Sequence, residues 1–361
     1  MGLGAQTTGA AGLTGLIITY YEKVGLERLL PKLRFYQFAD KKPLPARSGK
    51  TVQWYRFKTQ TAVTTNMTEG TVPTQVYLSA DTCAATLIQR GAYTKLSDML
   101  MLTAIDPILE DAAKLMGEKA ARTVDTYIQS QIGFHVKDAG DRSALTSALL
   151  TSGAYTRCYG GSIDHGASNE DGFPLLQNNV RLATSASVMG LTTSGLTVKS
   201  IQHAASFLRR RDVDPFDDGL YIGIIHPVAA YDLMTSSSWK GWQKYTNADL
   251  MHKGEIGQVG GVRFVESTDA PAYALSGDTM TSSVSGTVYG TIIFGPHAYG
   301  VTEIAGKANK QKGYEMFVKQ LGSAGTADPV NQAATVGFKI TMAARILNKC
   351  AGVVVVSNTT A

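Results

Sequence analysis

The sequence has few charged residues, few cysteines and no long apolar run. Charged residues make up 17% of the 361 residues and hydrophobic residues 44%, a balance typical of an ordered globular protein. Three widely separated cysteines exclude a disulfide-rich scaffold, and they show no CxxC spacing for zinc. No apolar run approaches the roughly 20 residues of a membrane-spanning helix. We therefore expect a soluble protein without a metal site or a membrane segment.

Motifs for catalysis and nucleotide binding are also missing. The six histidines show no HxxxH or HExxH spacing, and there is no Gly-x-Ser-x-Gly sequence. The stretch "HKGEIGQVGGVRFVES" (252–267) holds four glycines, from Gly254 to Gly261, as phosphate-binding loops often do. Such a loop needs a strand before the glycines and a helix after them, whereas here an alternating strand follows. The glycines predict a tight turn into a strand, and a nucleotide-binding enzyme is kept as a rival hypothesis.

Two other clusters have simpler interpretations than a binding site. The run "RRRDVDPFDDG" lacks the EF-hand ligands, because Phe216 and Ile225 stand where oxygen ligands are needed, so it predicts a helix end and a turn. Trp239 and Trp242, with lysines beside them, could bind single-stranded nucleic acid. One isolated pair favours instead a loop packed by its own aromatic side chains.

The N-terminal region is basic and irregular. The net charge of the chain is only +5, but ten Lys and Arg residues lie between Tyr20 and Lys58 against three acidic residues. Pro43, Pro45 and Gly49 prevent regular structure there. Residues 1–47 therefore predict an arm, and its charge is consistent with a solvated or partner-facing segment or with contact to nucleic acid.

A long two-stranded ribbon is predicted next, over residues 50–61 and 76–93. Val52, Trp54 and Arg56 alternate with other large side chains, so both faces of the ribbon carry apolar groups. Such a ribbon is not stable alone in water and needs a surface to lie on.

Downstream, the apolar period changes to that of a helix. Residues 105–132 predict a helix roughly 40 Å long, with Asp106 as its cap and Pro107 in its first turn. Residues 134–194 show little pattern and predict an insertion or a flexible loop. From residue 195, helices after Thr197 and His226 alternate with strands and predict a small α/β lobe. The last segment contains strands that return to the region of the long helix.

In this order, the elements resemble the major capsid proteins of tailed bacteriophages with the Johnson fold, the Hong Kong phage type. Several ordered stretches resemble one large subgroup of these coat proteins, including "QRGAYTKLSDMLMLTAIDPILEDAAKLMGEKA", "IIHPVAAYDL" and "GTADPVNQAATVGFKITMAARILN". The resemblance extends over most of the chain except residues 134–194. It implies an α+β fold with an N-terminal arm, an extended β-hairpin loop, a peripheral domain with a long spine helix, and an axial α/β domain.

The resemblance also implies a domain division and a function. The expected parts are the arm (1–47), the extended loop (48–95), the peripheral domain (96–133), the insert (134–194), the axial domain (195–310) and the return strands (311–361). The implied function is a non-enzymatic subunit, without cofactors, that assembles with itself as pentamers and hexamers into an icosahedral shell. The shell would enclose double-stranded DNA without sequence-specific binding, and scaffolding, portal and decoration proteins are expected partners. Its expected location is the virion, after assembly in the bacterial host cytoplasm.

Contacts between subunits are expected along the ribbon, which would lie across a neighbouring subunit. The candidate contact residues are Trp54, Arg56, Glu69 and Arg90. The cross-link between Lys and Asn side chains that some proteins of this fold form is not expected, because no lysine occupies the ribbon tip. An encapsulin-like compartment, which uses the same fold to hold an enzyme, is the alternative function.

Overall fold

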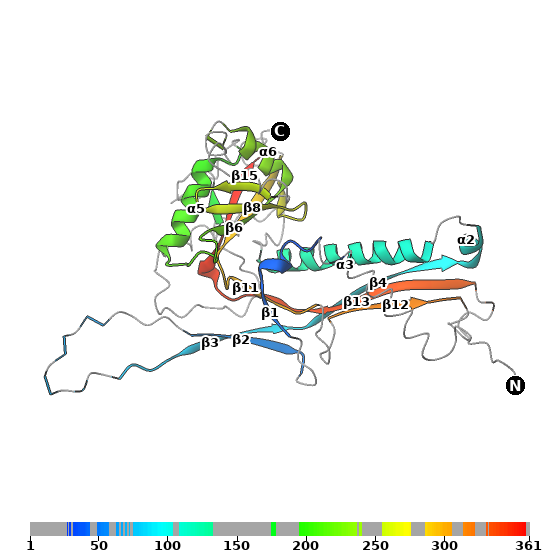
Figure 1. Cartoon of the computed structure of the whole chain (residues 1–361), viewed down its shortest axis with the longest axis horizontal. Coiled ribbons are helices and arrows are strands. Elements are labelled where there is room, and N and C mark those ends of the chain that lie inside the picture. Colours follow the sequence, from blue (N-terminus) through cyan, green and yellow to red (C-terminus); the bar gives the residue numbers. More distant parts are fainter. Residues whose placement is uncertain are drawn as a thin grey trace.

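A long arm, a lobe and a projecting hairpin make up the computed structural model (Figure 1). In the arm, a long helix lies along a three-stranded sheet, and the lobe stands at one end of the arm. The structure describes residues 27, 29, 32–43, 49–57, 63, 64, 66, 67, 69, 70, 72, 75–103, 108–132, 175–177, 195–236, 238, 239, 255–275, 286–304, 313–321, 330 and 332–358.

The long helix of the arm is α3 (Ile108–Ile132), as its apolar period predicts. Its 25 residues span roughly 38 Å. Met116 and Ala120 face the core, whereas Leu115 is exposed. The small residues among the buried positions allow neighbouring strands to approach the helix closely.

The sheet of the arm has the order β12–β13–β4, formed by Tyr314–Lys319, Ala333–Met342 and Ile88–Ser97. The central strand β13 is antiparallel to both neighbours. Alternate residues of β13, including Val336 and Ile340, are buried in the same core cluster as Val124 and Ile128 of α3. The short helix α2 (Asp98–Thr103) follows β4 directly.

The ribbon differs from the sequence prediction in its second strand. β2 (Thr51–Phe57) pairs only with β3 (Ala80–Thr86), in an antiparallel hairpin. The chain then leaves the hairpin at Leu87, and β4 pairs with β13 instead. The prediction that the ribbon continues to Tyr93 was wrong, because β4 finds its partner about 250 residues further along the chain.

The lobe is built on a sheet of order β5–β15–β10–β6–β8–β7, with β9 paired to β10. Helices α5 (Val198–Arg210) and α6 (Pro227–Thr235) pack against this sheet through a second core cluster. The strands are β5 (Leu175–Gln177), β6 (Tyr221–Ile225), β7 (Glu255–Val259), β8 (Val262–Glu266), β9 (Ala272–Leu275), β10 (Gly286–Phe294) and β15 (Gly352–Asn358).

Both helix starts in the lobe were predicted correctly. Thr197 and Ser200 form a capping box at the start of α5, and the His226 side chain caps α6 ahead of Pro227. The C-terminal run "GVVVV" is a strand, as its length predicts, but it lies inside the lobe sheet between β5 and β10. The lobe sheet therefore includes β5 and β15 together with strands from residues 221–294.

The glycine-rich run is a β-hairpin. Gly260 and Gly261 have φ values of +63° and +87° and connect β7 to the antiparallel β8. The predicted turn into a strand is confirmed. Glycine suits both positions, because it alone adopts positive φ values of this size at no steric cost. The residues before the turn also form a strand, which the sequence did not reveal. The arrangement is strand, turn, strand, without the helix that a phosphate loop requires.

A small sheet joins the arm to the lobe. Its order is β1–β11–β14, formed by Asp40–Lys42, Tyr299–Thr302 and Ala344–Ile346. Two short 3-10 helices, Tyr36–Phe38 and Lys349–Ala351, lie beside it in the sequence. Most of the predicted arm, the insert 134–194 apart from β5, Lys58 and Trp242 lie outside the described residues. Trp239 is fully buried in the lobe, where its ring packs edge-on against Phe264 at an interplanar angle of 61°.

Candidate assembly surface

The β2–β3 hairpin has one face covered by its own chain and one face open. Val52 and Trp54 of β2 and Cys83 and Ala85 of β3 are buried in a small cluster with Ala343 and Leu347. On the other face, Tyr55 and Phe57 are 65% and 69% exposed. The open face of the two strands carries no charged side chain; its residues are Thr51, Gln53, Tyr55, Phe57, Ala80, Thr82, Ala84 and Thr86.

The rest of the hairpin loop is apolar and uncovered as well. Six large side chains among its described residues are more than half exposed: Val63, Met67, Val72, Val76, Tyr77 and Leu78. Between residues 59 and 79 the only charged side chain is Glu69, which lies in a turn with Gly70. Extended apolar surface of this kind on a folded chain marks a site of interaction with another molecule.

A second uncovered surface is the face of the β12–β13–β4 sheet that points away from α3. The register places Tyr93, Gly337 and Phe317 side by side across the three strands. The Tyr93 and Phe317 rings are 75% and 47% exposed on this face. Lysines also reach this face from all three strands, namely Lys95, Lys319 and Lys339, against one acidic residue, Glu315, which pairs with Lys339 at 2.8 Å. We call this surface the open sheet face.

A buried carboxyl group holds the N-terminal segment against the arm. Asp125 of α3 is 1% exposed, and its Oδ2 accepts a hydrogen bond from the backbone N–H of Arg34 at 2.6 Å. Burial raises the pKa of Asp125 to about 7, although the N–H groups of Arg34, Phe35 and Tyr36 lower it, and nearby Asp269 raises it further.

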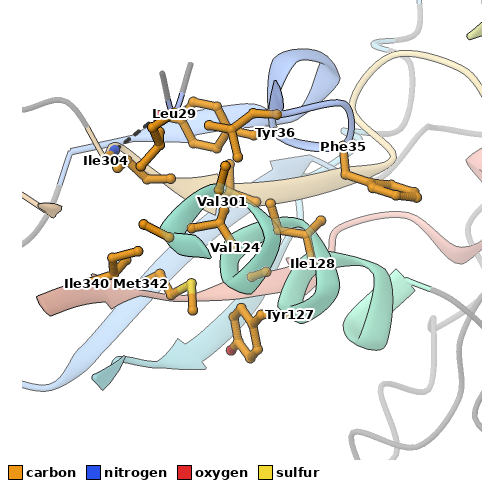
Figure 2. Packing of buried hydrophobic residues seen from close by; sticks show 14 of the residues in the cluster. Leu29, Phe35, Tyr36, Val124, Tyr127, Ile128, Val301, Ile304, Ile340 and Met342 are labelled. Carbon is orange, nitrogen blue, oxygen red and sulfur yellow. Dashed lines mark hydrogen bonds between the residues drawn. The ribbon is translucent and has the colours of Figure 1, made fainter. Parts of the chain in front are cut away.

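Tyrosines complete the attachment of this segment. The Tyr299 hydroxyl donates to the carbonyl of Phe35 at 2.5 Å, and burial raises the pKa of Tyr299 well above its usual value. The Tyr36 hydroxyl accepts from the N–H of Ile304 (Figure 2). In Figure 2, Leu29 and Tyr36 lie on one side of α3 and Tyr127 points to the other. Asp125 was not predicted as a functional residue, although a lone acidic residue at a buried position of the helical period is a usable signal.

The four predicted contact residues differ in how far their side chains are exposed. Trp54 is 9% exposed and packs inside its own chain, whereas Glu69 is exposed at the hairpin tip. Arg56 is partly buried, and its Nη1 atom has no hydrogen-bond partner among the described residues. Arg90 is exposed, and its guanidinium lies 5.0 Å from the centre of the Tyr127 ring. Contact of these residues with a second subunit stays a prediction.

The described residues provide little for chemistry. No group of three or more His, Cys, Asp or Glu side chains among them is placed to hold a metal ion. None of the described helices combines the length and the apolar character needed to cross a membrane. A cleft of about 470 Å³ lies between the hairpin and the lobe, lined by Trp54, Arg56, Arg211 and His297 among others. Its charges are mixed, because Asp40, Asp212 and Asp214 also line it.

Comparison with solved structures identifies the class of fold. The chain matches the capsid asymmetric unit of cyanophage Pam1 with a TM-score of 0.58 at 12% identity, over 93% of each chain. It matches the capsid of Ralstonia phage GP4 with a TM-score of 0.57 at 12% identity, over 87% of this chain and 85% of that chain. The head of Helicobacter pylori bacteriophage KHP40 gives a TM-score of 0.56 at 11% identity, over 90% and 92%.

At these identities the likeness establishes the fold. The chain has the α+β fold of the capsid subunits of tailed phages, the Johnson fold, as the resemblance of its sequence implies. No model of a protein family and no curated protein matches the sequence.

Proposed function

We propose that this protein is the major capsid subunit of a tailed bacteriophage and assembles with itself into an icosahedral shell around double-stranded DNA. The observation that carries the proposal is the fold shared with a phage capsid structure over 93% of both chains. The exposed apolar hairpin supports it, because a lone subunit would leave this surface in water.

We also propose that the hairpin of one subunit lies over the open sheet face of its neighbour. Both surfaces carry uncovered aromatic or apolar side chains, so their contact would remove these groups from water. Their charges are complementary, because the only charged residue of the hairpin tip is Glu69 and the open sheet face has an excess of lysines. Two different surfaces in contact form a head-to-tail interface, which closes into rings such as pentamers and hexamers.

Within this interface, the candidates for polar contacts are Glu69 and Arg56, whose Nη1 atom has no hydrogen-bond partner among the described residues. Arg90 lies at the edge strand of the arm sheet and could meet a neighbour there. Trp54 is buried in its own subunit, so it would support the hairpin from below without touching the neighbour. In this proposal the protein has a structural and not an enzymatic role, and it works without a cofactor. Scaffolding, portal and decoration proteins are the further partners, and the DNA inside is bound without sequence specificity.

The proposal places the protein in the virion after assembly in the host cytoplasm, and it is tested by electron microscopy. The full chain is expressed alone and together with a scaffolding protein, and closed particles of uniform diameter are expected. A chain that stays monomeric at high concentration in both cases would refute the proposal.

Particle contents separate the proposed function from the cellular-compartment alternative. The solved structures named above are phage capsids and heads, so they do not favour an encapsulin-like shell. Particles isolated from the native source should contain nuclease-protected DNA. An enclosed enzyme in place of DNA would favour the compartment.

A further inference from the structure

The hairpin rests on the small β1–β11–β14 sheet through a defined set of contacts. Residues Asp40, Gly300 and Arg345 are neighbours across the three strands, so they share one face of that sheet. Trp54 of the hairpin packs against Gly300, and Arg345 Nη1 donates to the carbonyl of Ala84 in β3. At the edge of the same face, the Lys42 ammonium donates to the carbonyl of Gln53 in β2.

The contact between Trp54 and Gly300 leaves no room for a side chain. A Cβ atom at residue 300 would lie 2.7 Å from Trp54 Nε1, 2.8 Å from Trp54 Cε2 and 3.2 Å from Leu347 Cδ1. Comfortable contacts between heavy atoms lie at about 3.5–4.0 Å, so even a methyl group would push the indole away by about 1 Å. Gly300 is therefore needed for the space it leaves to Trp54.

The lobe leaves one side of the hairpin root open. On the side of the lobe, the cleft of about 470 Å³ separates β2 from residues 211–214, so the lobe does not brace the strand there. The covered face of the hairpin is fixed by the cluster of Val52, Trp54, Cys83 and Ala85 on Ala343 and Leu347. We name the Trp54–Gly300 contact, with Leu347 beside it, the hairpin seat.

We propose that the hairpin seat sets the direction in which the hairpin leaves the subunit, and that Trp54 and Gly300 are thereby positioning residues for the curvature of the assembled shell. The second part rests on the proposed function. A shift of about 1 Å at Trp54, acting across the roughly 7 Å between Val52 and Trp54, tilts the hairpin by about 8°. Because the displacement grows with distance from the seat, the far end of β2 at Phe57 would move by more than the shift at Trp54.

The test compares the wild-type chain with Gly300→Ala, Trp54→Phe and the double variant. Gly300→Ala should give folded subunits that form open sheets or shells of altered diameter in cryo-electron microscopy. Trp54→Phe replaces the indole with a smaller ring that has more room to move away from a methyl group at residue 300, so adding it to Gly300→Ala should restore closed shells of wild-type diameter. A purely structural role predicts lower stability with unchanged shells, which would overturn the proposal.

Gly223→Ala is the matched control. Its Cβ would lie 2.7 Å from Phe264 Cε1, a similar contact with an aromatic ring, but inside the lobe and far from the seat. This variant should lose stability and still form shells of wild-type diameter. If Gly300→Ala does not fold, Trp54→Phe alone decides: a loosened seat should broaden the distribution of shell diameters, and uniform wild-type shells would overturn the proposal.

A failure of the proposed function can be recognised separately. If the wild-type chain forms no shells, hydrogen exchange in the isolated subunit tests the seat. Gly300→Ala should then raise the exchange of the β2 amides (Thr51–Phe57) by at least about tenfold, and Gly223→Ala should leave them unchanged. Equal exchange in Gly300→Ala and wild type would overturn the seat itself.

Discussion

Replacing Asp125 with asparagine removes a titrating group from the inside of the subunit while keeping its shape. The carboxyl group is 1% exposed, only one of its oxygens has a hydrogen-bond partner among the described residues, and Asp269 lies near it. Its ionised form is disfavoured there, and its pKa is about 7 in the folded subunit against 3.8 in the unfolded chain. Asparagine cannot ionise, and its amide oxygen can still accept from the N–H of Arg34.

The magnitude follows from the two pKa values. Because the folded value is the higher one, the wild-type subunit keeps its full stability at this site only below pH 4. It loses this stability as the pH rises to 7, where the unfolded chain releases the proton easily and the folded chain does not. The difference between the two pKa values corresponds to about 4 kcal/mol, because one pKa unit is about 1.4 kcal/mol. Asp125→Asn should therefore gain stability over wild type by a few kcal/mol between pH 4 and pH 8.

Urea unfolding of both proteins at a series of pH values measures this difference. Subtracting the two curves removes the titration of the other carboxyl groups and histidines, which the variants share. Hydrogen exchange of residues 32–42 adds a local measurement, because Asp125 holds this segment directly. If the two free energies of unfolding run parallel from pH 4 to pH 8, or if the asparagine variant is several kcal/mol less stable throughout, the reasoning about Asp125 is refuted.

Other predictions concern assembly and folding separately. Glu69→Lys should impair shell formation while leaving the melting temperature unchanged, and the same charge change at exposed Asp217 serves as the control; equal loss of folding and assembly would contradict the contact role. Adding Lys319→Glu to Glu69→Lys should recover part of the shell yield, measured by sedimentation, and no recovery would argue against the open sheet face as the partner. Thr197→Ala should destabilise the lobe by about 1 kcal/mol through loss of the α5 cap, measured by denaturant unfolding. Leu208→Ala, at a fully buried position of α5, should cost about 2–5 kcal/mol in the same assay, and a smaller loss would indicate that the lobe collapses around the cavity.

Features that depend on neighbouring residues could be predicted from the sequence. The apolar period marked α3, and Thr197 and the His226–Pro227 pair marked the starts of α5 and α6. Helix caps and apolar periods act over a few residues, so the chain carries their signal locally. The fold class was also predictable, because the order of the elements resembles that of a known capsid fold.

The candidate site was predictable only in part. The sequence indicated an apolar hairpin with Glu69 near its tip, but it did not show which face its own chain covers. Trp54 and Tyr55 are adjacent and both aromatic, yet one is buried on Gly300 and the other is 65% exposed. This difference depends on a strand about 245 residues away.

The amino-acid sequence alone was sufficient for helices α3, α5 and α6 and for the glycine turn before β8, because these arise from local spacing and composition. The departure of β4 toward β13, the place of β15 inside the lobe, the burial of Asp125 and the seat under Trp54 depended on the folded chain. Each of them requires contact between residues more than 50 positions apart, and such contacts leave no periodic pattern in the sequence.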